Sequence, residues 1–227
     1  AMPWVIVPPS WRPDIEGEAD IVEEVLRVHG YDRVPAVPMA REKVVSDVAV
    51  GTERQRAGLV RRALAARGLD EAVTWSFLAP SRADLFGGVG DDLHIVNPIS
   101  TDLAVMRPSA LPNLIEAAGR NFDRGMSDVA IFEVGPAFET ADEKGQRLVA
   151  AGVRLGHGCP RHWADPARPA DVFDAKADAL AALAAAGLAT GNPQLTTDAS
   201  DWYHPGRSGV FRLGKNVLAQ FGEVHPK

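Results

Sequence analysis

The fold is decided in the second half of the chain by the run Val129–Val134, which reads VAIFEV. β-Branched and aromatic residues of this kind favour strands. A second apolar run covers Val149–Leu155, and Trp202–Phe221 reads as two or three strands joined by short glycine turns. Because strands joined by short turns pair antiparallel, the sequence predicts an antiparallel sheet in this half.

Helices and shorter strands complete the predicted pattern. Strands are expected at about 71–78 and at 93–96. Apolar residues at helical spacing predict helices at about 17–29, 52–67, 112–122 and 174–186. Thr52 and Gln55 have the spacing of a capping box for the second of these helices. The predicted fold class is therefore α+β, an antiparallel β-sheet flanked by helices.

The composition is that of an ordinary water-soluble globular protein, with 46% apolar and 24% charged residues in a chain of 227. The 24 basic and 30 acidic residues give a net charge of −6, which weighs against a free-standing nucleic-acid binder. The single cysteine, Cys159, excludes an intrachain disulfide and favours a reducing compartment. The sequence has neither a membrane-spanning run nor a signal peptide. We therefore expect a cytoplasmic protein.

The two ends of the chain look cut. A strand-like run begins at Trp4, and another apolar run ends at Phe221, six residues before Lys227. Natural domains usually leave polar residues at their termini, so we expect a piece of a longer protein. Residues 1–38 are predicted to be the C-terminal tail of a small domain, 39–51 a linker, and 52–227 the main core domain.

The most pointed chemical signal is acidic. Asp20, Glu23 and Glu24 are spaced so that their carboxylates share one helical face, and Asp14 lies just upstream. Hard oxygen ligands of this kind suit Mg²⁺ or Ca²⁺. The alternative is a solvated acidic first turn that is stabilised by the helix dipole, with Arg27 offsetting one charge. The residues alone favour this second interpretation.

Other candidate sites are weaker. His157, Cys159 and His162 occupy one loop but lack the fourth ligand of a structural zinc site, so a polar loop with one buried thiol is expected. His204 lies in a turn and is more often a structural group. The sequence contains no nucleophile elbow, Walker A loop or GxGxxG fingerprint. Five arginines on the second predicted helix could meet phosphates or face a partner: Arg54, Arg56, Arg61, Arg62 and Arg67.

A resemblance to a known family shifts the choice for the acidic cluster from the solvated turn toward the metal site. Residues 9–35, which read PSWRPDIEGEADIVEEVLRVHGYDRVP, closely resemble the β chain of the bacterial phenylalanyl-tRNA synthetases, at the end of the domain before its core. Further blocks occur in the family's order and cover nearly the whole chain: residues 96–100, 106–112, 132–135, 171–176, 203–208 and 221–226.

The resemblance implies an α2β2 ligase that joins phenylalanine to tRNA(Phe) using ATP and Mg²⁺. It implies that residues 52–227 form a class II synthetase-like core that packs on the α subunit, where ATP is used, and does no chemistry itself. It also implies that Asp14, Asp20, Glu23 and Glu24 bind a Mg²⁺ shared with the α subunit. Arg107 and Glu133 fall in blocks that look like degraded class II motifs. We therefore expect no aminoacylation by this chain alone.

Editing and anticodon contact belong to domains outside this chain in the resembled family, and neither a membrane nor DNA is expected as a partner. Two other interpretations stay open. One is a stand-alone Mg²⁺-dependent phosphoryl-transfer enzyme built on the carboxylates between Asp14 and Glu24. The other is a tRNA-binding module that uses the arginine-rich helix at 54–67.

Overall fold

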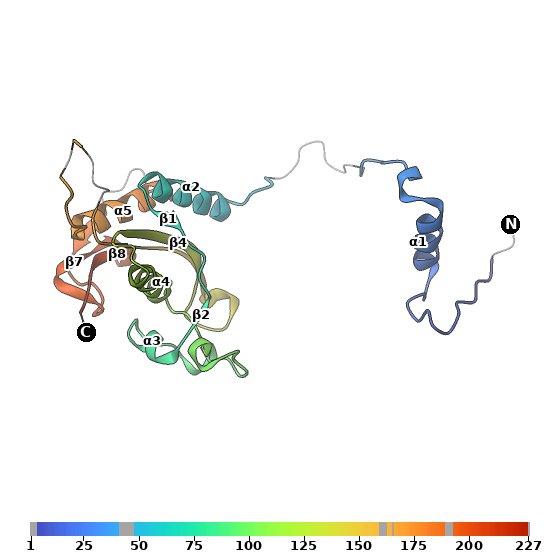
Figure 1. Ribbon diagram of the computed structural model, residues 1–227, viewed down its shortest axis with the longest axis horizontal. Coiled ribbons are helices and arrows are strands. Elements are labelled where there is room, and N and C mark those ends of the chain that lie inside the picture. The colour runs from blue at the N-terminus through green and yellow to red at the C-terminus, as the bar shows by residue number, and fades with distance from the viewer. Residues whose placement is uncertain (1–3, 41–47, 159–162, 165, 189–192, 227) are drawn as a thin grey trace. The chain divides into compact units, whose positions relative to one another are not determined.

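The computed structural model describes residues 4–40, 48–158, 163–164, 166–188 and 193–226 (Figure 1). The chain divides into two compact units, Ala1–Ala49 and Val50–Lys227. Each unit is described by itself below. None of the helices in the described ranges is long and apolar enough to cross a membrane.

The first unit is built around the helix α1, Glu18–His29, followed by the 3₁₀ turn η1, Tyr31–Arg33. Gly30 ends α1 with φ = 103°, a conformation that a residue with a side chain rarely adopts, so the predicted stop is confirmed. No residue of α1 is buried. Its valines Val22, Val25 and Val28 are exposed, whereas Ile21 and Leu26 are partly buried.

The second unit contains two three-stranded sheets. One has the order β1-β4-β5, with β1 at Asp70–Glu71, β4 at Val129–Phe138 and β5 at Gln146–Leu155. β4 and β5 pair antiparallel along their whole length, from Val129 opposite Leu155 to Phe138 opposite Gln146. β1 adds a two-residue parallel pair on the other edge of β4.

The other three-stranded sheet lies at the end of the chain and has the order β6-β7-β8. Its strands are Gln194–Thr196, Tyr203–Leu213 and Asn216–Val224, and all pair antiparallel. A two-residue turn with Gly214 at φ = 59° joins β7 to β8. A separate antiparallel pair joins β2, Phe77–Leu78, to β3, Val105–Met106. The predicted α+β class with antiparallel sheets is confirmed.

Helices cover both faces of the β4–β5 pair. Figure 1 shows α2, Thr52–Ala66, and α5, Val172–Ala185, on one side of β4, and α4, Leu111–Asp123, on the other. A short helix α3, Pro80–Asp84, and three 3₁₀ turns (η2 Asp91–Leu93, η3 Thr101–Leu103, η4 Glu143–Gly145) complete the unit. The largest core cluster joins α2 to β4 through Ala57, Val60, Leu64, Leu69, Phe132 and Val134.

Three local predictions are wrong. Residues 93–96 form no strand beyond a single bridge at His94, because Asn97-Pro98 turns the chain away and leaves Val96 fully exposed. Thr52 caps nothing, since α2 already starts there and Gly51 is its N-cap. The expected strand at 71–78 is divided between β1 and β2 by an irregular segment that carries Thr74.

Candidate functional site

Two of the four predicted carboxylates contact an arginine that the sequence pattern did not single out. Arg12 donates to Asp14 through Nε at 2.9 Å and through Nη2 at 2.7 Å, and Nη2 also lies 2.8 Å from Glu24 Oε1. Arg27 Nη2 contacts the other Glu24 oxygen at 2.6 Å. The structure therefore brings Asp14 and Glu24 together by means of a guanidinium.

The other two predicted ligands have different positions. Asp20 occupies the third position of α1, where its Oδ2 accepts the backbone N–H groups of Glu16 at 2.9 Å and Gly17 at 2.8 Å. That is the role of a helix-capping carboxylate. Glu23 is exposed to solvent. Asp20 thus caps the first turn of its own helix in this structure.

Three of the four carboxyl groups are held in the ionised form. Hydrogen bonds from Arg12, and secondly from Arg27, lower the pKa of Glu24 to about 2. The hydrogen bond from Arg12 also lowers the pKa of Asp14, and the two backbone N–H groups lower the pKa of Asp20. At neutral pH these groups are anions that a cation can bind.

Within the described ranges, no group of three or more histidine, cysteine, aspartate or glutamate side chains is placed to hold a metal ion. The four carboxylates therefore do not converge on one point, and the magnesium site stays a prediction. The sequence did carry a signal for the arrangement seen, because Arg12 precedes Asp14 by only two residues. A cation supplied by the chain itself is the simplest partner for clustered anions.

In the second unit, the most deeply buried charged side chain among the described residues is that of Arg107, which has no exposed surface. Its Nη2 lies 2.7 Å from Glu133 Oε1 and its Nε donates to the carbonyl of Pro136 at 2.8 Å. Nη1 donates to Thr74 Oγ1 at 2.9 Å, and the Thr74 hydroxyl donates to Glu133 Oε2 at 2.6 Å. The guanidinium is fully surrounded by protein and has no free edge for a ligand.

The histidine loop lies only partly within the described residues. His157 Nδ1 contacts Asp128 Oδ1 at 2.8 Å, whereas Cys159 and His162 lie outside the described ranges. His204 Nδ1 accepts the backbone N–H of Gly206 at 3.0 Å. His204 lies in β7 and not in a turn, and this local bond agrees with the expectation that it is a structural group.

Two arginines of the second predicted helix make contacts inside the fold, Arg61 in α2 and Arg67 at its C-cap. Arg61 contacts Glu71 at 2.7 Å and donates to the carbonyl of Val134 at 2.8 Å. Arg67 pairs with Asp178 of α5. Asp178 also accepts a hydrogen bond from Arg154 of β5 at 2.6 Å. Part of the basic face that suggested tRNA binding therefore holds this helix against β4 and α5.

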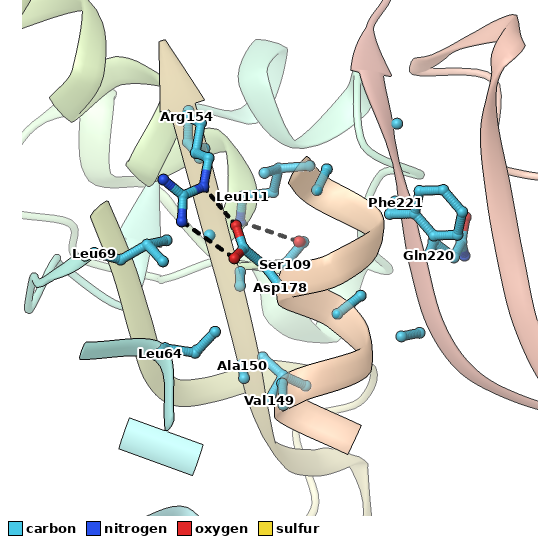
Figure 2. A pocket seen from close by; sticks show the side chains of 18 of the residues that line it. Leu64, Leu69, Ser109, Leu111, Val149, Ala150, Arg154, Asp178, Gln220 and Phe221 are labelled. Atoms are coloured by element: carbon cyan, nitrogen blue, oxygen red, sulfur yellow. Dashed lines mark hydrogen bonds and ion pairs between the residues drawn. The ribbon is translucent and has the colours of Figure 1, made fainter. Parts of the chain in front are cut away.

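A large cavity in the second unit was not foreseen from the sequence. It has a volume of about 1370 Å³ and lies between β5 and β8, with α2, α4 and α5 contributing to its walls. Figure 2 shows Arg154 joined to Asp178 on one side of α5, and Phe221 and Gln220 of β8 on the other side of this helix. Most of the lining is apolar.

These features define an α+β core of antiparallel sheets covered by helices on both faces, with its buried arginine and glutamate used for structure rather than left free. Comparison with known families narrows the class. Residues 41–227 match the model of the phenylalanyl tRNA synthetase beta chain CLM domain, and residues 2–31 match that of the tRNA synthetase B5 domain. The chain belongs to the phenylalanyl-tRNA synthetase β-chain family, which confirms the resemblance seen in the sequence.

Similar proteins agree with this assignment. The phenylalanine–tRNA ligase beta subunit of Paramagnetospirillum magneticum is 55% identical over 222 residues, covering 98% of this chain and 28% of the relative. That of Rhodospirillum rubrum is 56% identical, covering 96% of this chain and 27% of the relative. The chain thus spans little more than a quarter of the relatives it matches.

Among solved structures, this chain is similar to pyrrolysyl tRNA synthetase from Desulfitobacterium hafniense, with a TM-score of 0.45 and 19% identity. The aligned region covers 73% of this chain and 54% of that chain. A second structure of the enzyme from that organism has the same TM-score, with 17% identity.

Proposed function

We propose that this chain is the non-catalytic core of the β subunit of a phenylalanine–tRNA ligase, a structural platform on which the α subunit packs. The parent enzyme would be a cytoplasmic α2β2 heterotetramer that uses ATP at the α subunit and binds tRNA(Phe). Family membership and the names of the similar proteins support this assignment. The activity belongs to the assembled enzyme.

The observation that carries the non-catalytic role is the burial of Arg107. An arginine that stabilises a polyphosphate must present its guanidinium to the ligand. Arg107 instead uses Nε, Nη1 and Nη2 on Pro136, Thr74 and Glu133, with no exposed surface. Releasing it would leave Glu133, which is only 3% exposed, as an unpaired buried charge.

Packing against the α subunit is supported by exposed apolar side chains. Val73 and Trp75 precede β2, and Val96 and Ile99 precede β3, its ladder partner. All four expose at least 65% of their surface. Exposed large apolar side chains of this kind are candidates for burial in a protein interface.

The chemistry of Asp14, Asp20, Glu23 and Glu24 fits Mg²⁺, a hard cation that prefers carboxylate oxygens. Their arrangement in the chain by itself does not fit, because Arg12 holds Asp14 and Glu24 and the Asp20 carboxylate caps α1. We therefore place Mg²⁺ binding in the assembled enzyme, where the α subunit would supply the remaining ligands. Bound there, the ion would neutralise the carboxylates in place of the guanidinium of Arg12.

Two measurements test the proposed function. Purified chain is expected to show no phenylalanine-dependent ATP–pyrophosphate exchange, and measurable exchange would refute the non-catalytic role. The chain is also expected to co-purify with the α subunit of Paramagnetospirillum magneticum, whose β subunit is 55% identical to it.

The interface is tested by the double variant Val96→Asp/Ile99→Asp, which should abolish this co-purification. Leu213→Asp is the matched control, because Leu213 is an apolar side chain, 53% exposed, next to the β7–β8 turn. Equal loss in both variants would point to general damage to the fold, and retention in both would refute the assigned surface.

A further inference from the structure

Residues 73–77, which follow β1 and run into β2, have an alternating pattern of exposure. Val73 and Trp75 expose 90% and 65% of their surface, whereas Thr74 between them is partly buried. The side chains therefore alternate between solvent and the protein interior, as they do along a strand. We call residues 73–77 the docking segment, because Val73 and Trp75 are two of the four apolar side chains that we assign to the surface for the α subunit.

The backbone of the docking segment is held mainly by side chains. Among the described residues, no hydrogen bond joins the backbone of Val73, Thr74 or Trp75 to another backbone group. Asn113 of α4 instead donates from Nδ2 to the carbonyls of Trp75 and Phe77, at 3.1 Å in both cases. These bonds from a side chain take the place of the ladder that would hold a strand of a sheet.

Thr74 links the docking segment to the buried ion pair. Its hydroxyl accepts a hydrogen bond from Arg107 Nη1 at 2.9 Å and donates one to Glu133 Oε2 at 2.6 Å. The backbone N–H of Arg107 also donates to the carbonyl of Ser76 at 2.9 Å. The inward side of the segment is therefore bound to the Arg107–Glu133 pair through a hydroxyl and through a backbone carbonyl.

The buried polar and charged side chains of the described ranges are those of Arg107, Asn113 and Glu133, and all three contact the docking segment. Burying such groups costs free energy, and apolar side chains of similar volume often give a core that is at least as stable. Asn113 Oδ1 is itself buried without a hydrogen-bond partner in the described part of the chain. The effect that the three side chains share is to fix the backbone of the docking segment.

We propose that Arg107, Glu133 and Asn113 are positioning residues that hold the docking segment in its binding conformation before the α subunit binds. A segment that is already ordered loses less conformational entropy on association. The three side chains fix the segment from its inward side, so that Val73 and Trp75 project to solvent in a defined direction. This inference rests on the proposed packing of the α subunit against this surface.

The alternative is that the three buried groups serve only the stability of the core. Thr74 separates the two roles, because the ion pair keeps its other bonds without the Thr74 hydroxyl. Arg107 Nη2 still contacts Glu133 Oε1 at 2.7 Å, and Arg107 Nε still donates to the carbonyl of Pro136 at 2.8 Å. Removing the hydroxyl therefore detaches the docking segment from the pair and leaves the pair in place.

The test uses the double variant Thr74→Val/Asn113→Leu, which removes the hydroxyl and the amide that hold the docking segment. NMR order parameters of the backbone N–H groups at residues 73–75 should fall from about 0.85, the value of rigid backbone, to about 0.6 or below. The affinity for the α subunit of Paramagnetospirillum magneticum should fall by about tenfold, since binding must now order the segment. The urea midpoint should change little, because the ion pair remains and the unpaired Asn113 Oδ1 is removed.

Thr196→Val is the matched control. The Thr196 hydroxyl on β6 also lies between an arginine and a carboxylate, those of Arg212 and Asp198. This variant should keep both the order parameters of the docking segment and the affinity for the α subunit. Should the double variant fail to fold, Asn113→Leu alone gives the same comparison at Trp75 and Phe77, whose carbonyls then lose their donor.

Three results would overturn the proposal. The first is order parameters at residues 73–75 that stay near those of the unchanged chain. The second is a more mobile docking segment with unchanged affinity for the α subunit. The third is an equal loss of affinity in Thr196→Val. If the unchanged chain did not bind the α subunit, the proposed function would be refuted instead, and the order parameters of the free chain would still decide whether the buried side chains fix the segment.

Discussion

Gly135 is the residue whose identity depends most directly on the buried ion pair. A Cβ atom at this position would lie 2.7 Å from Arg107 Nη2 and 2.7 Å from Glu133 Oε1. Both groups are buried and bonded to each other, so neither can move aside. We expect Gly135→Ala to lower the free energy of unfolding by about 2–3 kcal/mol, as overpacking does elsewhere.

Gly119→Ala is the control for this substitution. Gly119 lies in α4, and a methyl group added there would meet no atom within 4 Å outside its own helix. Alanine there should stabilise the protein by about 0.5–1 kcal/mol through helix propensity. Urea unfolding of both variants measures the difference, and a harmless Gly135→Ala would show that the pair is less rigid than its contacts indicate.

The side chain of Arg12 determines whether the acidic segment can bind a cation from solution. Removing the guanidinium leaves Asp14 without this partner and Glu24 paired with Arg27 alone. We expect Arg12→Ala to bind Mg²⁺ about fivefold more tightly than the unchanged chain, the value of an exposed ion pair. Isothermal titration with MgCl₂ measures the change. Arg33→Ala, which removes an exposed arginine of the same unit, should leave the affinity unchanged. Equal affinities in all three proteins would show that Arg12 does not keep these carboxylates from binding a cation.

At the scale of single elements, the start of α5 predicts a dependence of stability on pH. Asp174 Oδ1 and Oδ2 lie 2.6 Å and 2.7 Å from the guanidinium of Arg168, which is the main cause that lowers the pKa of Asp174 from 3.8 to about 2. The folded protein therefore binds this proton less readily than the unfolded chain does. The stabilisation is complete above about pH 4 and is lost as the pH falls toward 2.

Asp174→Asn should therefore be less stable than the unchanged chain at pH 7, and the two should converge as the pH approaches 2. Thermal unfolding of both proteins between pH 2 and pH 7 gives the comparison. Curves that stay parallel over the whole range would show that the Arg168–Asp174 pair does not stabilise the start of α5.

Two neighbouring arginines on α2 should differ in their effect on stability. Arg61 joins α2 to Glu71 and to the carbonyl of Val134, whereas Arg62 is exposed. We expect Arg61→Ala to lower the free energy of unfolding by about 1 kcal/mol, and Arg62→Ala to change it by less than about 0.5 kcal/mol. Denaturant unfolding measures both. The same comparison matters for any test of tRNA binding by this helix, since changing Arg61 also weakens the fold.

At the scale of the whole molecule, charge and exposed apolar surface act together. The net charge is −6 at pH 7 and the isoelectric point is about 5.5. Mutual repulsion therefore vanishes near pH 5.5, while Val73, Val96 and Ile99 stay exposed. We expect the chain to associate reversibly at that pH and to disperse again at pH 8. Light scattering across this range checks the expectation, and a flat profile would contradict it.

Local pattern predicted much of this molecule, and contacts between distant residues account for most of what it missed. The runs at 129–134 and 149–155 became β4 and β5, and four helices were found close to their observed bounds. The cavity between β5 and β8 could not be foreseen, because its walls come from elements that lie far apart in the sequence. The role of Arg107 likewise depends on Glu133 and Thr74, which lie 26 and 33 residues away.

The buried pair of Arg107 and Glu133 also restricts how the chain can diverge in evolution. Losing one partner alone leaves an uncompensated charge and costs about 3–5 kcal/mol, a large part of the roughly 5–15 kcal/mol that keeps a domain folded. A lineage must therefore keep both residues or replace both nearly at once. Selection on folding alone would preserve this arginine among relatives, whether or not any substrate ever reached it.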